Sequence, residues 1–123
     1  MPYEIEVQDY FSAAHQLRGY RGKCEHMHGH NWKVAVALRA GQLDKTGLVL
    51  DFTILKRLLR QALKEFDHTV INDHPEFQRQ NPTSENLARF LFERLQPRFK
   101  KSGLTLARVT VWESIRSRAS YYE

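Results

Sequence analysis

The amino-acid sequence predicts an α+β fold in which a four-stranded antiparallel sheet carries two helices on one face. Three observations lead to this prediction. Two N-terminal stretches alternate apolar and polar residues, two central stretches repeat apolar residues at helical spacing, and residues 104–123 are β-branched and alternating, with a bend. The resulting order of strand, strand, helix, helix, strand, strand favours antiparallel neighbours with both helices packed together against the sheet.

Both N-terminal strands end their apolar face in histidine. The first covers residues 3–15 and reaches His15 on its apolar parity, and the second covers residues 31–40 and is preceded by histidines on its apolar parity. The apolar residues of the two strands are Ile5, Val7, Phe11 and Ala13, then Trp32, Val34, Val36 and Leu38. A face that packs under helices would ordinarily continue in Val, Leu or Phe. The imidazoles therefore gather at one end of the sheet.

The two predicted helices cover residues 52–66 and 85–96, where leucines and other apolar residues recur at helical spacing. Each is preceded by residues that commonly cap a helix by accepting a hydrogen bond from its first free N–H groups. The candidate caps are Asp51 or Thr53 for the first helix, and Thr83 or Ser84 for the second.

The composition indicates one globular domain that spans residues 1–123. With 41% hydrophobic and 27% charged residues, the chain can bury a single core without disulfides. The first twenty residues lack the apolar run of a signal peptide, and no stretch approaches the roughly 20 apolar residues of a membrane span. A single cysteine suits a reducing compartment. We therefore expect a cytoplasmic protein without a membrane partner.

The net charge of +5 does not indicate a nucleic-acid partner. The basic residues are scattered and mostly interleaved with core positions of the predicted helices and strands, whereas a nucleic-acid surface needs them on one face. A small phosphorylated substrate explains the same charge.

The segment "CEHMHGH" (24–30) contains the only cysteine and three of the six histidines. Residues i and i+2 of an extended segment project to the same side, so His28 and His30 can hold one ion, with His15 as a third ligand from the neighbouring strand. Three imidazoles with an open fourth position are typical of catalytic zinc, although iron, copper and nickel also accept imidazole. Spacing alone leaves His26 as an alternative ligand. The competing interpretation is a polar loop whose histidines hydrogen-bond locally.

Five motifs resemble the 6-pyruvoyl-tetrahydropterin synthase family, in the family's order and over nearly the whole chain. They are "FSAAH" (11–15), C-x-x-x-H-G-H (24–30), "FDH" (66–68), "NPTSEN" (81–86) and "VWES" (111–114). The similarity is greatest to the bacterial 6-carboxytetrahydropterin synthase branch, which serves queuosine (7-deazapurine) biosynthesis. The resemblance implies a T-fold whose subunits join edge to edge into a barrel and stack as a homohexamer, a dimer of trimers.

The resemblance also implies roles for individual residues. The implied zinc ligands are His15, His28 and His30, the implied catalytic residues are Cys24, Asp67 and His68, and the implied pterin contacts are Glu113, Thr83 and Ser84. Cys24 would be an acid/base group outside the metal shell, relayed by Asp67 and His68, and Glu113 would anchor the pterin ring. The implied substrate is 7,8-dihydroneopterin triphosphate, which would become 6-carboxytetrahydropterin, acetaldehyde and triphosphate.

Two other functions stay open at the level of the sequence. A 6-pyruvoyl-tetrahydropterin synthase would use the same zinc and anchor but release triphosphate without losing carbon, and a metal-binding module without catalysis needs only the three histidines. Glu25 is a departure to watch, because related enzymes with glutamate at the cysteine position cleave the side chain differently. Basic residues flank the site in sequence and are candidates for binding the triphosphate, namely Arg18, Arg21, Lys23, Arg116 and Arg118.

Overall fold

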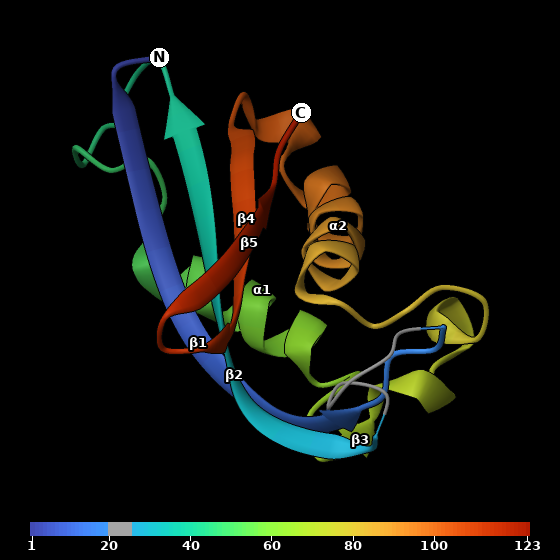
Figure 1. Cartoon of the computed structure of the whole chain (residues 1–123). Helices are drawn as coiled ribbons and strands as arrows, with labels where there is room; N and C mark the ends of the chain where they lie inside the picture. The colour runs from blue at the N-terminus through green and yellow to red at the C-terminus, as the bar shows by residue number, and fades with distance from the viewer. Residues whose placement is uncertain (20–25) are drawn as a thin grey trace.

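The structure is a computed structural model that describes residues 1–19 and 26–123. A mixed sheet in the strand order β3-β1-β2-β4-β5 carries both helices on one face (Figure 1). The strands are β1 (Tyr3–His15), β2 (His28–Ala40), β3 (Thr69–Val70), β4 (Thr105–Ser114) and β5 (Ser117–Tyr121), and the α-helices are α1 (Phe52–Leu63) and α2 (Ser84–Leu95). Four short 3-10 helices connect these elements among the described residues: η2 (Ile71–Asp73) and η3 (Pro75–Phe77) before α2, and η4 (Gln96–Arg98) and η5 (Lys100–Ser102) after it. No helix among the described residues is long and apolar enough to cross a membrane.

The predicted α+β fold and the order of its main elements are confirmed, with three local differences. Strand β2 begins at His28 rather than at residue 31. A fifth strand, β3, runs parallel to β1 beside Ala13 and Ala14, so the sheet is mixed rather than wholly antiparallel. With two residues, it is too short to produce an alternating pattern. Helix α1 ends at Leu63 rather than near residue 66, and Phe66 reaches the core from the turn that follows.

Side-chain caps fix the start of both helices. The Asp51 carboxylate accepts a hydrogen bond from the Thr53 N–H at 2.8 Å, which settles the first pair of candidates in favour of Asp51. The Thr83 hydroxyl accepts one from the Asn86 N–H at 3.1 Å, so Thr83 is the N-cap of α2 and Ser84 its first residue. Each cap satisfies a backbone donor that the helix itself cannot pair.

Strands β1 and β2 pair antiparallel over their whole length, in a register that brings the histidines together. His15 is directly opposite His28, and Ala13 is directly opposite His30. Because opposite residues of an antiparallel pair project to the same face, all three imidazoles share one side of the sheet. The two strands continue together past β4 and curve toward the segment that carries β3 (Figure 1). The histidines therefore lie where these strands leave the main body of the sheet.

The hydrophobic core between sheet and helices continues into the histidine cluster through Trp32. Its side chain is fully buried, its ring stacks on Phe11 at 5.8 Å between centroids, and its Nε1–H donates to the Ala13 carbonyl at 3.2 Å. The rings of His15 and His30 meet the same indole edge-on at 4.8 and 5.4 Å. Two of the imidazoles thus pack against Trp32 at the inner side of the cluster.

Replacing Trp32 by alanine should lower the free energy of unfolding by about 3–5 kcal/mol, because a large cavity would remain in the core. Trp112 is the matched control, since it is only half-buried, with the Lys33 ammonium 4.1 Å from its ring centroid. Its replacement should cost about 1–2 kcal/mol. Denaturant unfolding of both variants measures the difference, and equal losses would contradict the core position of Trp32.

Candidate metal centre

Three imidazoles converge at the ends of β1 and β2. The Nε2 atoms of His15 and His28 are 3.0 Å apart, and the rings of His28 and His30 meet edge-on at 4.8 Å between centroids. His15 is buried, whereas the side chains of the other two are 29% and 26% exposed, so the cluster opens to solvent on one side. The sequence-based grouping of these three histidines agrees with this geometry.

Backbone carbonyls define which ring nitrogen carries a hydrogen in two of the imidazoles. Nδ1 of His15 is 2.7 Å from the Pro82 carbonyl oxygen, and Nδ1 of His28 is 2.7 Å from the His26 carbonyl oxygen. A carbonyl only accepts, so each Nδ1 carries the hydrogen and each neutral ring presents an Nε2 lone pair. His26 thus contributes its backbone, and its ring is not among the groups placed to hold an ion.

Two lone pairs facing each other at 3.0 Å repel unless a shared proton or a metal ion lies between them, and two imidazolium rings there would repel as well. Metal-binding histidines typically donate their second ring N–H to a carbonyl or carboxylate in this way, which fixes the ring and its tautomer. The pair therefore has a geometry that suits two metal ligands held in place by backbone carbonyls.

His30 completes the set. Its Nε2 is buried and has no well-formed hydrogen bond to the described residues, although the Glu113 Oε1 lies 2.9 Å away. An unsatisfied buried nitrogen is costly, and a bound ion would satisfy it. Burial lowers the pKa of His30, as do the charges of His15 and His28, while Glu113 opposes the shift. The neutral form that a metal requires is thus favoured.

Glu113 joins the three imidazoles, which the sequence did not predict. Its Oε1 is 3.1 Å from Nε2 of His15 and 3.7 Å from Nε2 of His28, and the four residues offer ligand atoms that all lie within 4.8 Å of one another. Pairing of β4 with β2 brings the carboxylate there. Three imidazoles and a carboxylate suit zinc and several other transition metals. The role of Glu113 as a pterin anchor stays a prediction.

Asp67 and His68 form a pair at the edge of β1. The Asp67 Oδ1 is 3.1 Å from Nδ1 of His68 and also accepts a hydrogen bond from the Ser12 N–H at 2.9 Å, which lowers the pKa of Asp67. His68 has a left-handed backbone, with φ of 60°, while its N–H donates to the Ser12 carbonyl at 2.6 Å. Such strain at a residue other than glycine persists where surrounding bonds enforce it, often at functional sites.

A hollow of about 400 Å³ lies between His68 and the ends of β1 and β2, mainly on the face of the strands opposite the imidazoles, and His30 is the one member of the histidine cluster in its lining. Its lining includes Gly29 and His30 of β2 on one side and His68 and Thr69 on the other. Volumes of this order accommodate small-molecule ligands. The imidazole of His68 is 82% exposed and therefore accessible to a molecule bound there.

The "NPTSEN" motif positions His15, a function that the sequence did not reveal. The Asn81 side chain accepts from the Arg18 N–H at 2.7 Å and donates to the Arg18 carbonyl at 2.9 Å, which holds Pro82 and its carbonyl against the end of β1. The sequence feature that could have indicated this role is the Asn-Pro pair directly before a capped helix. Contacts of Thr83 and Ser84 with a pterin stay predictions.

Two of the candidate triphosphate-binding residues already contact other parts of the protein. The guanidinium of Arg18 donates to the carbonyls of Phe77 and Gln80 at 2.9 and 3.3 Å, so this side chain clamps two loops together. Arg118 lies over the Trp112 ring at 5.7 Å. Arg21 and Lys23 lie outside the described residues, as do Cys24 and Glu25.

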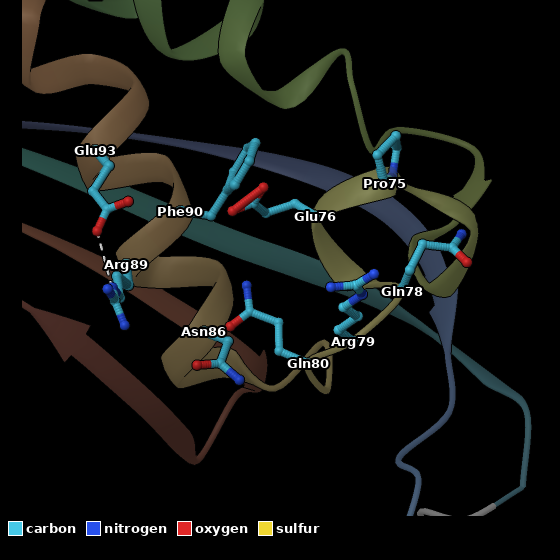
Figure 2. Close-up of a pocket in the computed structure, with 9 residues that line it drawn as sticks. All are labelled: Pro75, Glu76, Gln78, Arg79, Gln80, Asn86, Arg89, Phe90 and Glu93. Carbon is cyan, nitrogen blue, oxygen red and sulfur yellow. Dashed lines mark hydrogen bonds and ion pairs between the residues drawn. The ribbon is translucent and has the colours of Figure 1, made fainter.

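A separate groove of about 410 Å³ lies between η3 and α2 (Figure 2). Its charged residues include Arg89 and Glu93, which pair with each other at 2.9 Å. None of the residues that line it is a histidine, a cysteine or a predicted site residue. We therefore assign the chemistry to the histidine cluster and not to this groove.

Comparisons with known proteins show the family that the chain resembles. The sequence profile of the family described as "6-pyruvoyl tetrahydropterin synthase" matches residues 4–123. A provisionally named 6-carboxy-5,6,7,8-tetrahydropterin synthase of Archaeoglobus fulgidus is 39% identical over 110 residues, covering 89% of this chain and 87% of the relative. The 6-carboxy-5,6,7,8-tetrahydropterin synthase of Synechocystis is 36% identical over 118 residues, covering 91% and 87%. The solved structure of Caenorhabditis elegans 6-pyruvoyl tetrahydropterin synthase is similar with a TM-score of 0.86 and 32% identity, covering 98% of this chain and 95% of that one.

Proposed function

Because the chain belongs to the 6-pyruvoyl tetrahydropterin synthase family, we propose that it is a zinc-dependent 6-carboxy-5,6,7,8-tetrahydropterin synthase of queuosine biosynthesis. Its substrate would be 7,8-dihydroneopterin triphosphate, and its products 6-carboxytetrahydropterin, acetaldehyde and triphosphate. The observation that supports this proposal most strongly is the convergence of three imidazoles and the Glu113 carboxylate, whose ligand atoms all lie within 4.8 Å of one another. Relatives named for the carboxy-forming reaction support the choice of product.

The proposed reaction balances without an external oxidant. Triphosphate leaves the terminal side-chain carbon, and the bond between the two hydroxyl-bearing carbons breaks, so that two carbons depart as acetaldehyde. The carbon that stays on the ring is oxidised to the carboxyl level while the dihydropterin ring is reduced to the tetrahydro form. Water supplies the second carboxyl oxygen.

Each residue of the site has a distinct part in this proposal. His15, His28 and His30 would hold zinc, which supplies a Lewis acid for the hydroxyl oxygens of the substrate. Cys24 would exchange protons with the side-chain carbons, since a thiol of pKa about 8.5 becomes a useful base beside an imidazolium. His68, whose tautomer Asp67 fixes at 3.1 Å, would exchange protons with Cys24.

A 6-pyruvoyl tetrahydropterin synthase is the second candidate function. The similarity to the C. elegans enzyme of that name, over 98% of this chain, favours it. The same metal site and acid/base groups would serve, but the reaction would stop once triphosphate had left and the side chain had become a pyruvoyl group. Carbon–carbon cleavage is therefore the step that separates the two candidates.

Incubating the zinc-loaded protein with 7,8-dihydroneopterin triphosphate tests the proposal. We expect acetaldehyde, 6-carboxytetrahydropterin and triphosphate in equal amounts, with the His15→Ala protein as a metal-free control. A 6-pyruvoyl pterin without acetaldehyde would establish the second candidate instead. If the protein shows no turnover at full zinc occupancy, it is a metal-binding module without catalytic activity.

We also predict a homohexamer in solution. The single-chain sheet has β5 at one edge and β3 beside β1 at the other, and edges of this kind present backbone groups that another chain can pair. Joining such edges would extend the sheet into the barrel expected of a T-fold. Light scattering at micromolar concentration should give about 87 kDa, six times the 14.5 kDa chain mass. A monomeric mass would contradict the assembly.

A further inference from the structure

The carboxylate of Glu113 occupies the position of a fourth metal ligand. Ligand atoms around a tetrahedral ion with bonds of 2.0–2.2 Å are about 3.3–3.6 Å from one another. The Glu113 Oε1 is 2.9, 3.1 and 3.7 Å from the Nε2 atoms of His30, His15 and His28, distances that bracket this value. A carboxylate that served only to bind a pterin ring would not need to lie among the imidazoles.

A β-bulge lies at Glu113. Trp112 pairs with Arg118 and Ser114 pairs with Ser117, so Glu113 is an extra residue in the β4–β5 ladder. An extra residue bends the strand and re-aims its side chain. The Glu113 side chain is 33% exposed, about as much as those of His28 and His30 at 29% and 26%, so the carboxylate is not enclosed by the core and can move away.

The proposed function conflicts with a permanently closed site. Four protein ligands are typical of structural zinc, whereas catalytic zinc keeps one position open for water or substrate. A pterin presents a ring N–H and an exocyclic amino group side by side, and a carboxylate that accepts both hydrogen bonds uses both of its oxygens. Binding the ring in that way would withdraw Oε1 from the metal.

We infer that Glu113 is the fourth metal ligand in the pterin-free protein and exchanges the metal for the pterin ring when a pterin binds. One carboxylate therefore closes the metal site at rest and opens it only when the ring is in place. The ligand role stands on the geometry alone, whereas the exchange rests on the proposed pterin substrate.

The ligand role can be tested without substrate, in the cobalt(II)-loaded protein. The visible absorption of Co²⁺ depends on the number and type of its ligands. Glu113→Gln should change this spectrum and weaken Co²⁺ binding roughly 10–100-fold or more. Glu113→Asp, which keeps the charge but withdraws the carboxylate by one methylene, should behave in the same way. Glu93→Gln, at a glutamate 51% exposed on α2, is the control and should match the wild type.

Wild-type spectra and affinity in Glu113→Gln would overturn the ligand role. Wild-type behaviour in Glu113→Asp alone would also overturn it, because the effect would then be one of charge rather than coordination. Circular dichroism of each variant confirms that the fold is retained before the spectra are compared.

The exchange can be tested with pterin itself, which has the ring but neither side-chain hydroxyls nor phosphate. Adding pterin to the wild-type Co²⁺ protein should shift its spectrum toward that of Glu113→Gln, and the same addition to Glu113→Gln should change little. An unchanged wild-type spectrum at saturating pterin would overturn the exchange. Neither measurement requires turnover, so a failed product assay would leave the ligand role supported.

Discussion

Replacing His15 by alanine should abolish stoichiometric metal binding. His15 is the buried member of the cluster, held between the Trp32 indole and the Pro82 carbonyl, so no other described side chain can take over its position without moving the core. Loss of a ligand-orienting partner alone typically weakens a metal site 10–100-fold, and loss of the ligand itself should exceed about 100-fold. Metal content after dialysis, measured by mass spectrometry, should fall to near zero.

His26→Ala is the matched control for this experiment. It removes an imidazole from the same segment but keeps the backbone carbonyl that accepts from His28 Nδ1 at 2.7 Å. We expect this variant to retain one metal ion per chain. Full metal content in His15→Ala, or its loss in His26→Ala, would contradict the assignment of the ligands.

Replacing Cys24 by alanine should give the second large effect, on turnover rather than on metal binding. A missing general acid/base group typically costs about 10²–10⁴-fold in rate. Because Cys24 is assigned outside the metal shell, the variant should fold and hold its metal. Cys24→Ser is the conservative companion and should also be slow, since a hydroxyl is a much weaker acid than a thiol. Turnover close to that of the wild type would remove the thiol from the mechanism.

The sequence predicted most of the fold because periodicity reports burial directly. Alternation located β1 from residue 3 to residue 15 as observed, and leucine spacing located both helices. The grouping of the three histidines could be predicted for the same reason, because a histidine among the apolar positions of a strand stands out from the pattern. Spacing alone did not exclude His26 as a ligand. The hydrogen bond from the His28 ring to the His26 carbonyl shows that His26 supports the cluster through its backbone.

What the sequence did not predict depends on contacts between distant segments. Glu113 shares the apolar parity of Val109 and Val111, so alternation could indicate its face, but its meeting with the histidines depends on the pairing of β4 with β2, which leaves no periodic signature. The Pro82 carbonyl that orients His15 comes from 67 residues away. Arg18 looked like a phosphate ligand by its charge, yet its guanidinium is hydrogen-bonded to two loop carbonyls.

The zinc K-edge X-ray absorption spectrum of the metal-loaded, pterin-free protein tests the central claim most directly, namely that three imidazoles form the metal site without the thiol. We predict four nitrogen or oxygen neighbours at roughly 2.0–2.1 Å, with the outer-shell scattering of three imidazoles. A sulfur neighbour at about 2.3 Å would place Cys24 in the metal shell and contradict the account, as would scattering from fewer than three imidazoles.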